Sequence, residues 1–256
     1  MSEDVRRVAL TTDIGEGFGI WRLGDDEALM KIVTAANVAC GFHGGDPRIM
    51  RATCEMAAEN AVAIGAQVSY RDLAGFGRRF VDADVDELID DLLYQMGALD
   101  IFARLAGSSV SYVRAHGALY NAAATHKGHA RAIVEATRLF DPSLPILCQD
   151  GTATWTIAQE SGIRVVAEAF VDRAYTADGL LLPRTQPNAL VTDPDEAAQR
   201  AVRMVTHGRI TAQSGEEFPI SAQALLVHSD TPGAVEVARR TRKALQKAGI
   251  QLSAQL

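Results

Sequence analysis

The sequence predicts an α/β protein in which about seven parallel strands close into an irregular, TIM-like β/α barrel. Strand-like runs alternate with amphipathic helical stretches from one end of the chain to the other, an order that gives parallel sheets flanked by helices. Most predicted strands are followed directly by polar residues suited to binding or catalysis. No Ser- or Pro-rich linker and no low-complexity tract interrupts the 256 residues, so we expect one domain over residues 1–256.

The expected strands are short runs of apolar and β-branched residues. They cover residues 7–12, 36–40, 62–68, 112–115, 145–148, 164–170 and 224–227. The clearest helix has an apolar stripe at 3.6-residue spacing, formed by Val85, Leu88, Ile89, Leu92, Leu93, Met96 and Leu99. Asp46, Asp193 and Thr231 each precede a proline, which predicts three helix N-caps. Gly107 and Gly208 are the expected helix stops.

The polar residues at the strand ends favour a barrel over an open doubly wound sheet. They are Asp13, His43, Gln67 with Ser69, His116, Gln149 with Asp150, Glu168 with Asp172, and His228 with Asp230. In an open sheet only the loops around a switch point share a site, whereas a barrel brings all its C-terminal loops to one mouth. An open sheet is the alternative architecture.

Composition describes a soluble protein with little affinity for polyanions. The chain has 48% apolar and 22% charged residues, and 25 Lys and Arg against 32 Asp and Glu give a net charge of −7. We expect no nucleic-acid partner, because no basic face is evident. Three cysteines without a C-x-x-C pair favour a reducing compartment. Without a signal-peptide pattern or a membrane-length apolar run, a cytoplasmic protein is expected.

The first glycine-rich motif, T-T-D-I-G-E-G-F-G, covers residues 11–19. Gly15 and Gly17 can turn the backbone and expose amides that hold a phosphate or carboxylate, although the spacing is not that of a Walker A loop. A flexible turn is the alternative interpretation. Asp13 and Glu16 add two acids suited to metal or proton chemistry.

Two further motifs carry histidines. In A-C-G-F-H-G-G-D-P, residues 39–47, His43 lies among glycines that include Gly44, so its ring has little to pack against. In R-A-H-G-A-L-Y-N, residues 114–121, His116 closes a strand. We expect Asp13, His43 and His116 to form a facial metal site or an acid/base group.

Three other motifs suggest anion binding and further polar groups. In G-F-G-R-R-F, residues 75–80, Arg78 can clamp a carboxylate or phosphate, while Arg79 is as well explained by a surface ion pair. E-A-F-V-D-R-A-Y, residues 168–175, and V-H-S-D-T-P-G-A-V, residues 227–235, place acids at strand ends. The cysteines are interpreted as buried apolar residues.

Together these motifs resemble one family, LamB/YcsF, whose members are the A subunits of bacterial 5-oxoprolinase. The resemblance runs from about Asp13 to Asp230 and rests on D-I-G-E-G-F-G, A-C-G-F-H-G-G-D-P, S-Y-x-D-L-x-G-F-G-R-R, H-G-A-L-Y-N, D-R-x-Y and D-T-P-G-A. It implies a barrel similar to that of the polysaccharide deacetylases. It also implies ATP-dependent opening of 5-oxoproline (pyroglutamate) to L-glutamate with partner subunits B and C.

The candidate site combines the residues above with this resemblance. Asp13, His43 and His116 are the expected catalytic residues and also the expected ligands of a divalent metal. The expected contacts to a small carboxylate-bearing substrate or to phosphate are Gly15, Glu16, Gly17, Gly44, Ser69, Arg78, Arg114, Tyr120, Asn121, Glu168, Asp172, Arg173, His228 and Asp230.

The chain departs from the family pattern inside this site. Thr11 replaces an expected Asn, Gln67 an expected His, and Arg114 an expected Lys, while Ser229 interrupts the late H-G-D. Three alternatives therefore stay open: a paralogue acting on a related lactam, a carboxylate-binding subunit that has lost catalysis, and a metal-dependent amide hydrolase that needs no ATP. The oligomeric state, including a homo-oligomer, is also open.

Overall fold

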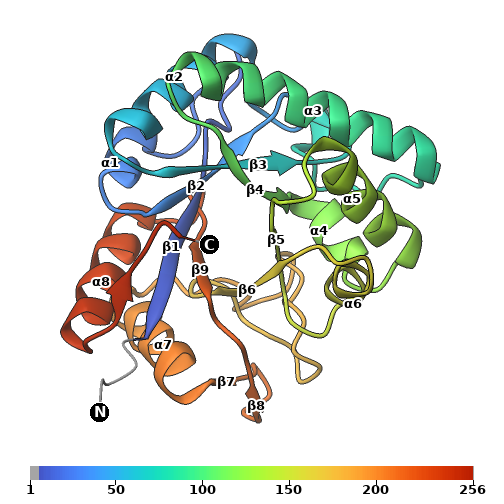
Figure 1. The fold of residues 1–256 in the computed structure, drawn as a ribbon. Helices are drawn as coiled ribbons and strands as arrows, with labels where there is room; N and C mark the ends of the chain where they lie inside the picture. The colour runs from blue at the N-terminus through green and yellow to red at the C-terminus, as the bar shows by residue number, and fades with distance from the viewer. Residues whose placement is uncertain (1–5, 256) are drawn as a thin grey trace, which may run out of the picture.

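A computed structural model describes residues 6–255, and these residues form a closed parallel β-barrel (Figure 1). Seven strands make the wall: β1 (Arg7–Ile14), β2 (Ala35–Ala39), β3 (Ala63–Val68), β4 (Val110–Ala115), β5 (Ile146–Cys148), β6 (Val165–Phe170) and β9 (Ala224–Val227). Each pairs in parallel with the next, and the pairing of β1 with β9 closes the ring. The predicted irregular barrel is confirmed, and the open sheet is wrong.

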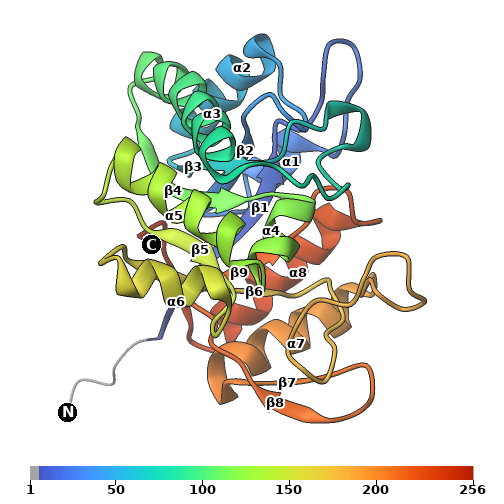
Figure 2. The same ribbon diagram turned by 90° about the vertical axis from the view of Figure 1, so that its right-hand side faces the viewer.

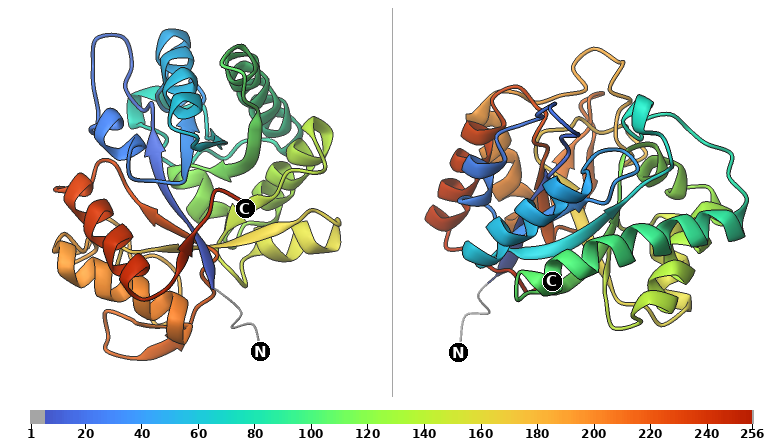
Figure 3. Two further views of the ribbon diagram at one scale, coloured as in Figure 1. Left: turned by 60° about the vertical axis from the view of Figure 1, so that its left-hand side comes forward. Right: turned by 90° about the horizontal axis from the view of Figure 1, so that it is seen from above.

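Helices cover the outside of the strands (Figure 3). They are α1 (Asp26–Met30), α2 (Pro47–Glu59), α3 (Val85–Leu105), α4 (Gly117–Ala123), α5 (Lys127–Phe140), α6 (Ala153–Glu160), α7 (Pro194–His207) and α8 (Ala234–Lys247), with a 3₁₀ turn, η1 (Leu73–Gly75). The sequence did not predict the small antiparallel hairpin of β7 (Arg209–Thr211) and β8 (Glu217–Pro219), or the parallel pairing of β10 (Gln251–Leu252) with the start of β1.

The barrel interior is filled by side chains rather than left as a channel. Tyr112 is fully buried and packs with small residues such as Ala35 and Ala224. A Cβ on Gly65 would lie 2.0 Å from the Tyr112 ring, so only glycine leaves room for this aromatic side chain. The Tyr112 hydroxyl donates to Asn37 Oδ1 at 2.8 Å, and this bond satisfies its polar end inside the core.

Most predicted helix boundaries are confirmed, with one correction. The Asp46 and Asp193 carboxylates cap α2 and α7, and Gly208 ends α7 in a left-handed conformation. Thr231 does not cap a helix, because α8 begins at Ala234 with Gly233 as its N-cap. Instead, the Thr231 hydroxyl donates to the buried Asp172 carboxylate at 2.6 Å.

The loops that follow the strands gather at one end of the barrel, opposite the start of β1 (Figure 2). None of the helices in residues 6–255 is long and apolar enough to cross a bilayer. Residues 1–5, part of the segment without a signal-peptide pattern, lie outside the described residues.

Asp26, at the start of α1, is expected to cost stability at neutral pH. Burial raises its pKa to about 6, so the fold favours the protonated form, and stability is lost as the pH rises from 3.8 through 6. We expect Asp26→Asn to raise the free energy of unfolding by about 3 kcal/mol at pH 7.5 but only about 1 kcal/mol at pH 4.5. Urea unfolding at both pH values measures this. Asp90→Asn, on an exposed turn of α3, is the control, and an equal gain at both pH values would contradict the prediction.

Candidate functional site

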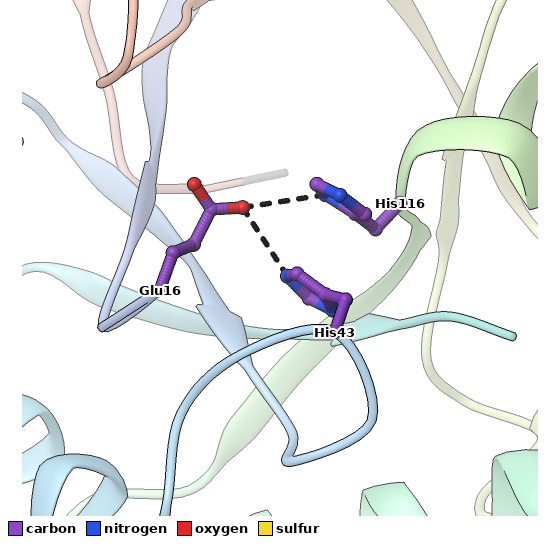
Figure 4. Close-up of side chains that lie close together, drawn as sticks. All are labelled: Glu16, His43 and His116. Carbon is purple, nitrogen blue, oxygen red and sulfur yellow. Dashed lines mark hydrogen bonds and ion pairs between the residues drawn. The ribbon is translucent and has the colours of Figure 1, made fainter. Parts of the chain in front are cut away.

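Glu16, His43 and His116 converge at the mouth of the barrel (Figure 4). They come from the loops that follow β1, β2 and β4, and all three are buried. Glu16 Oε1 lies 3.2 Å from His43 Nε2 and 3.3 Å from His116 Nδ1. The two imidazole rings stack with centroids 3.7 Å apart and planes 8° apart. We call these three residues the triad.

The hydrogen bonds of His43 fix which of its nitrogens carries the proton. Ser69 Oγ donates its hydrogen to the Tyr70 carbonyl at 3.0 Å, so at 3.1 Å from His43 Nδ1 it accepts a hydrogen bond from that nitrogen. Gln95 holds the Ser69 backbone through both its N–H and its carbonyl. The Nε2 lone pair of His43 therefore faces Glu16.

His116 is held in the opposite tautomer. Its Nε2 lies 3.0 Å from the Phe76 carbonyl, which can only accept, so Nε2 carries the proton and Nδ1 presents its lone pair to Glu16. Burial and the neighbouring His43 ring hold the pKa of His116 well below its ordinary value. Gln67 Nε2, 3.1 Å away, also points to this Nδ1.

Three acceptors therefore converge in the triad: two imidazole lone pairs and one carboxylate. Gln67 can donate to His116 Nδ1, and Ser229 donates to Glu16 Oε2. Within residues 6–255, however, no donor faces Glu16 Oε1 and His43 Nε2, so this contact needs a shared proton or a cation. One ligand atom from each residue lies within 4.8 Å of the others, and each ring is anchored through its second nitrogen, as in metal-binding histidines. Two histidines and a carboxylate also suit a divalent transition metal. The residues present therefore fit a bound divalent cation.

The acid of this cluster is Glu16, whereas the sequence predicted Asp13. Asp13 Oδ1 instead accepts from Asn37 Nδ2 at 2.9 Å and lies 3.4 Å from Arg114 Nη1. Arg114 also binds Glu168 at 2.8 Å. Burial alone would lower the pKa of Arg114, but Glu168 and Asp13 raise it above its ordinary value, so this guanidinium is a compensated, permanently charged group.

The glycines around the triad permit close packing. A Cβ on Gly44 would lie 2.5 Å from the Glu16 carbonyl oxygen, and one on Gly77 would lie 2.9 Å from both histidine side chains. Gly77 also has φ +63°, a conformation that favours glycine. The amide of Gly15 donates to Asp26, so this amide, expected to hold an anion, is already occupied.

A cavity of about 330 Å³ opens beside the triad, within the size range of small-molecule sites. Of the predicted site residues, its lining includes Asp13, Arg78, Arg114, His116, Tyr120, Asn121, Arg173 and His228. The sequence missed Arg184, which also lines it and lies in a long loop without a motif. A larger hollow of about 980 Å³, between α7 and α8, contains none of the predicted site residues.

The other predicted residues support this cavity from behind. Asp172 accepts from the backbone N–H of His228 at 2.9 Å and from its Nδ1 at 3.0 Å. These bonds and the one from Thr231 hold its pKa near 2, although burial alone would raise it. Arg79 forms an ion pair with Asp72, which agrees with its interpretation as part of a surface ion pair. The three cysteines are buried and free, as expected.

Sequence comparison places this geometry in a family. A sequence model described as the LamB/YcsF family matches residues 8–255. The chain belongs to the LamB/YcsF family. A Streptomyces avermitilis protein, named as the A subunit of 5-oxoprolinase, is 53% identical over 247 residues, which cover 96% of this chain and 99% of that protein. One from Mycolicibacterium paratuberculosis with the same name is 52% identical over 247 residues, 96% of this chain and 98% of that protein.

Solved structures agree with this membership. The crystal structure of a lactam utilization protein from Thermus thermophilus has a TM-score of 0.92 at 43% identity, and the match covers 97% of this chain and 99% of that one. A structure from Enterococcus faecalis, described as a putative cellobiose-phosphate cleavage protein, has a TM-score of 0.55 at 12% identity, covers 98% of this chain and 97% of that one, and shares the fold alone.

The structure shows where this LamB/YcsF protein departs from the pattern expected of its family. Gln67 contacts the proton-free nitrogen of His116, and its amide can donate a hydrogen bond there but cannot take up a proton. Among residues 6–255 its Oε1 is buried without a hydrogen-bond partner. Thr11, in contrast, lies in the barrel wall, where its hydroxyl donates to the Leu225 carbonyl at 3.4 Å. Ser229, the other departure near the triad, donates from its hydroxyl to Glu16 Oε2 at 3.3 Å. Gln67 and Ser229 are thus the changes that contact the triad.

Proposed function

We propose that this chain is the A subunit of a 5-oxoprolinase, which opens 5-oxoproline to L-glutamate with ATP and with partner subunits B and C. The observation that carries the proposal is the buried triad beside a small cavity lined by arginines. Near-full-length relatives that bear the name of this 5-oxoprolinase component support it.

The proposed reaction needs both the proton site and the charge of this cavity. An unstrained lactam is a stabilised amide, so phosphorylation of its carbonyl oxygen by ATP makes that oxygen a leaving group. The first water adds to the activated carbon and expels the ring nitrogen as an amine, which leaves an acyl phosphate. The second water hydrolyses this acyl phosphate, so 5-oxoproline, ATP and two waters give glutamate, ADP and phosphate. A proton leaves the ring nitrogen when the carbonyl oxygen is phosphorylated, and the departing amine regains protons. Glu16, between two proton-free imidazole nitrogens, is the group placed to hold and return a proton.

A divalent cation fits the same three residues. Glu16, His43 and His116 would hold it, and when bound it would polarise the substrate carbonyl or a water molecule. The Ser69 hydroxyl and the Phe76 carbonyl would keep both imidazole rings in the ligating tautomer.

The release of ADP and glutamate from 5-oxoproline and ATP tests the proposal. We expect turnover only when the chain is combined with subunits B and C of a typical family member, and we expect His116→Ala to abolish it. His207→Ala removes an exposed histidine on α7 and is the matched control. A complex that assembles without turnover would contradict the proposed activity and favour a binding subunit.

The fit of the triad to a cation favours a second candidate, a metal-dependent amide hydrolase that needs no ATP. It predicts one bound metal per chain, loss of turnover with a chelator, and hydrolysis without ADP formation. Metal analysis of the purified chain and of Glu16→Gln, together with ADP release, separates the two candidates.

A further inference from the structure

Arg173 is a buried cation that no carboxylate of the described residues contacts. It follows β6 and is 4% exposed, and its guanidinium donates to the Leu182 carbonyl at 2.5 Å and to the Ala189 carbonyl at 3.4 Å. Among residues 6–255 it forms no ion pair within 4.0 Å. Burial and Arg184 lower its pKa to about 10, so it remains charged at neutral pH. A buried charge without a partner is costly.

Two more arginines lie beside it and share a single acid. Arg78 Nη2 lies 2.5 Å from Asp230 Oδ2, and Arg184 binds both oxygens of Asp230 at 3.1–3.2 Å. Two of the three guanidinium groups, those of Arg78 and Arg184, thus share one carboxylate, and the guanidinium of Arg173 has no such contact. All three arginines line the 330 Å³ cavity.

The other acids nearby are already engaged. Asp172 accepts from His228 and Thr231, while Asp13 and Glu168 bind Arg114. Among the described residues none of these three carboxylates forms an ion pair with Arg173 within 4.0 Å, although the charge of the adjacent Asp172 offsets part of that of Arg173. The same cavity reaches His116 of the triad, so an anion held by the arginines would lie next to the proton site.

We propose that Arg173, with Arg184 and Arg78, binds the carboxylate of the lactam substrate and thereby orients the amide bond toward the triad. This inference rests on the proposed function and adds to it the group that selects the substrate. The segment from Arg173 to Arg184 follows β6 and carries two of the three arginines, whereas Arg78 follows η1. A substrate bound by all three would therefore connect the loop after β6 to the loop after η1.

A pair of matched ligands tests the carboxylate assignment. 2-Pyrrolidinone has the same lactam ring as 5-oxoproline but no carboxylate. By calorimetry, on the chain alone and in the assembled complex, we expect 5-oxoproline to bind about 10- to 100-fold more tightly than 2-pyrrolidinone. Arg173→Gln is expected to remove this preference and Arg173→Lys to retain part of it. Arg138→Gln, an exposed arginine on α5 paired with Glu135, is the control.

Other outcomes would overturn the assignment. Because Arg173 also supports two backbone carbonyls, its replacement can loosen the loop, so the partly exposed Arg184→Gln is measured beside it. Equal affinity for the two lactams, or an unchanged preference in both Arg173→Gln and Arg184→Gln, would contradict the proposal. Inorganic phosphate that binds here without displacing 5-oxoproline would assign the arginines to a phosphoryl group instead. Carboxylate-dependent binding without turnover would refute the proposed function alone, whereas turnover with an unchanged KM in Arg173→Gln would refute the subsite alone.

Discussion

Glu16→Gln is expected to lower turnover by about 10²- to 10⁴-fold, the usual contribution of a positioned proton-transfer group. Glutamine keeps the size of the side chain but cannot carry a proton between the lactam nitrogen and the two imidazole rings. Its amide can donate to His43 Nε2 or His116 Nδ1, the lone pairs that Glu16 now faces. The fold should therefore remain as stable as the wild type, or become slightly more stable.

Steady-state ADP and glutamate release, together with the thermal midpoint, measures the effect of Glu16→Gln. Glu135→Gln, which changes an acid in an exposed ion pair on α5, is the matched control and should leave turnover unchanged. If Glu16→Gln retained turnover close to that of the wild type, Glu16 would not be the proton-transfer group. A fall in thermal midpoint would instead point to a structural role.

Arg114→Met is expected to destabilise the fold by about 3–5 kcal/mol, the usual cost of removing one partner of a buried ion pair. Arg114 is 2% exposed and lies between Glu168 and Asp13. Without it, two buried carboxylates would face each other inside the barrel mouth. Denaturant unfolding at pH 7.5 measures the loss.

Arg114→Lys is the informative control, because it keeps the charge and restores the residue that the family resemblance leads us to expect. We expect it to lose less than half as much stability as Arg114→Met. Combining Arg114→Met with Glu168→Gln should recover part of the lost stability, because one uncompensated carboxylate is then removed. A loss below about 1 kcal/mol for Arg114→Met would show that the two acids are protonated or hydrated in the fold.

The barrel could be predicted because its signals are local. Apolar runs, helix N-caps such as Asp46 and strand-end polar residues are each contained in a few neighbouring residues. Prediction fails where tertiary contacts override a local preference. Thr231 precedes a proline as a helix cap does, but the buried Asp172 takes its hydroxyl. The pairing of β10 with β1 joins Arg7 to Gln251, near opposite ends of the chain, which no local pattern reveals.

The site could be predicted only in part, for a related reason. The sequence identifies His43 and His116 as histidines of the site. It does not show which acid joins them, because Asp13 and Glu16 lie three residues apart in one glycine loop. Which acid turns toward the imidazole rings depends on Asn37, which holds Asp13 from the neighbouring strand. Arg184 carries no motif and reaches the cavity only because its long loop folds over the barrel mouth. Composition and residue spacing do not indicate that this loop returns to the cavity.

The pairing of β10 with β1 makes the end of the barrel opposite the mouth a suitable place to attach the protein to a surface. Arg7 lies opposite Gln251 in the sheet. The first and last strands of the described chain are therefore neighbours, and they lie far from the loops that form the mouth (Figure 2). A fusion partner, bead or sensor surface attached there leaves the triad and the arginines facing outward. Ligand binding at the mouth can therefore be followed on a tethered chain without obstructing that end of the barrel.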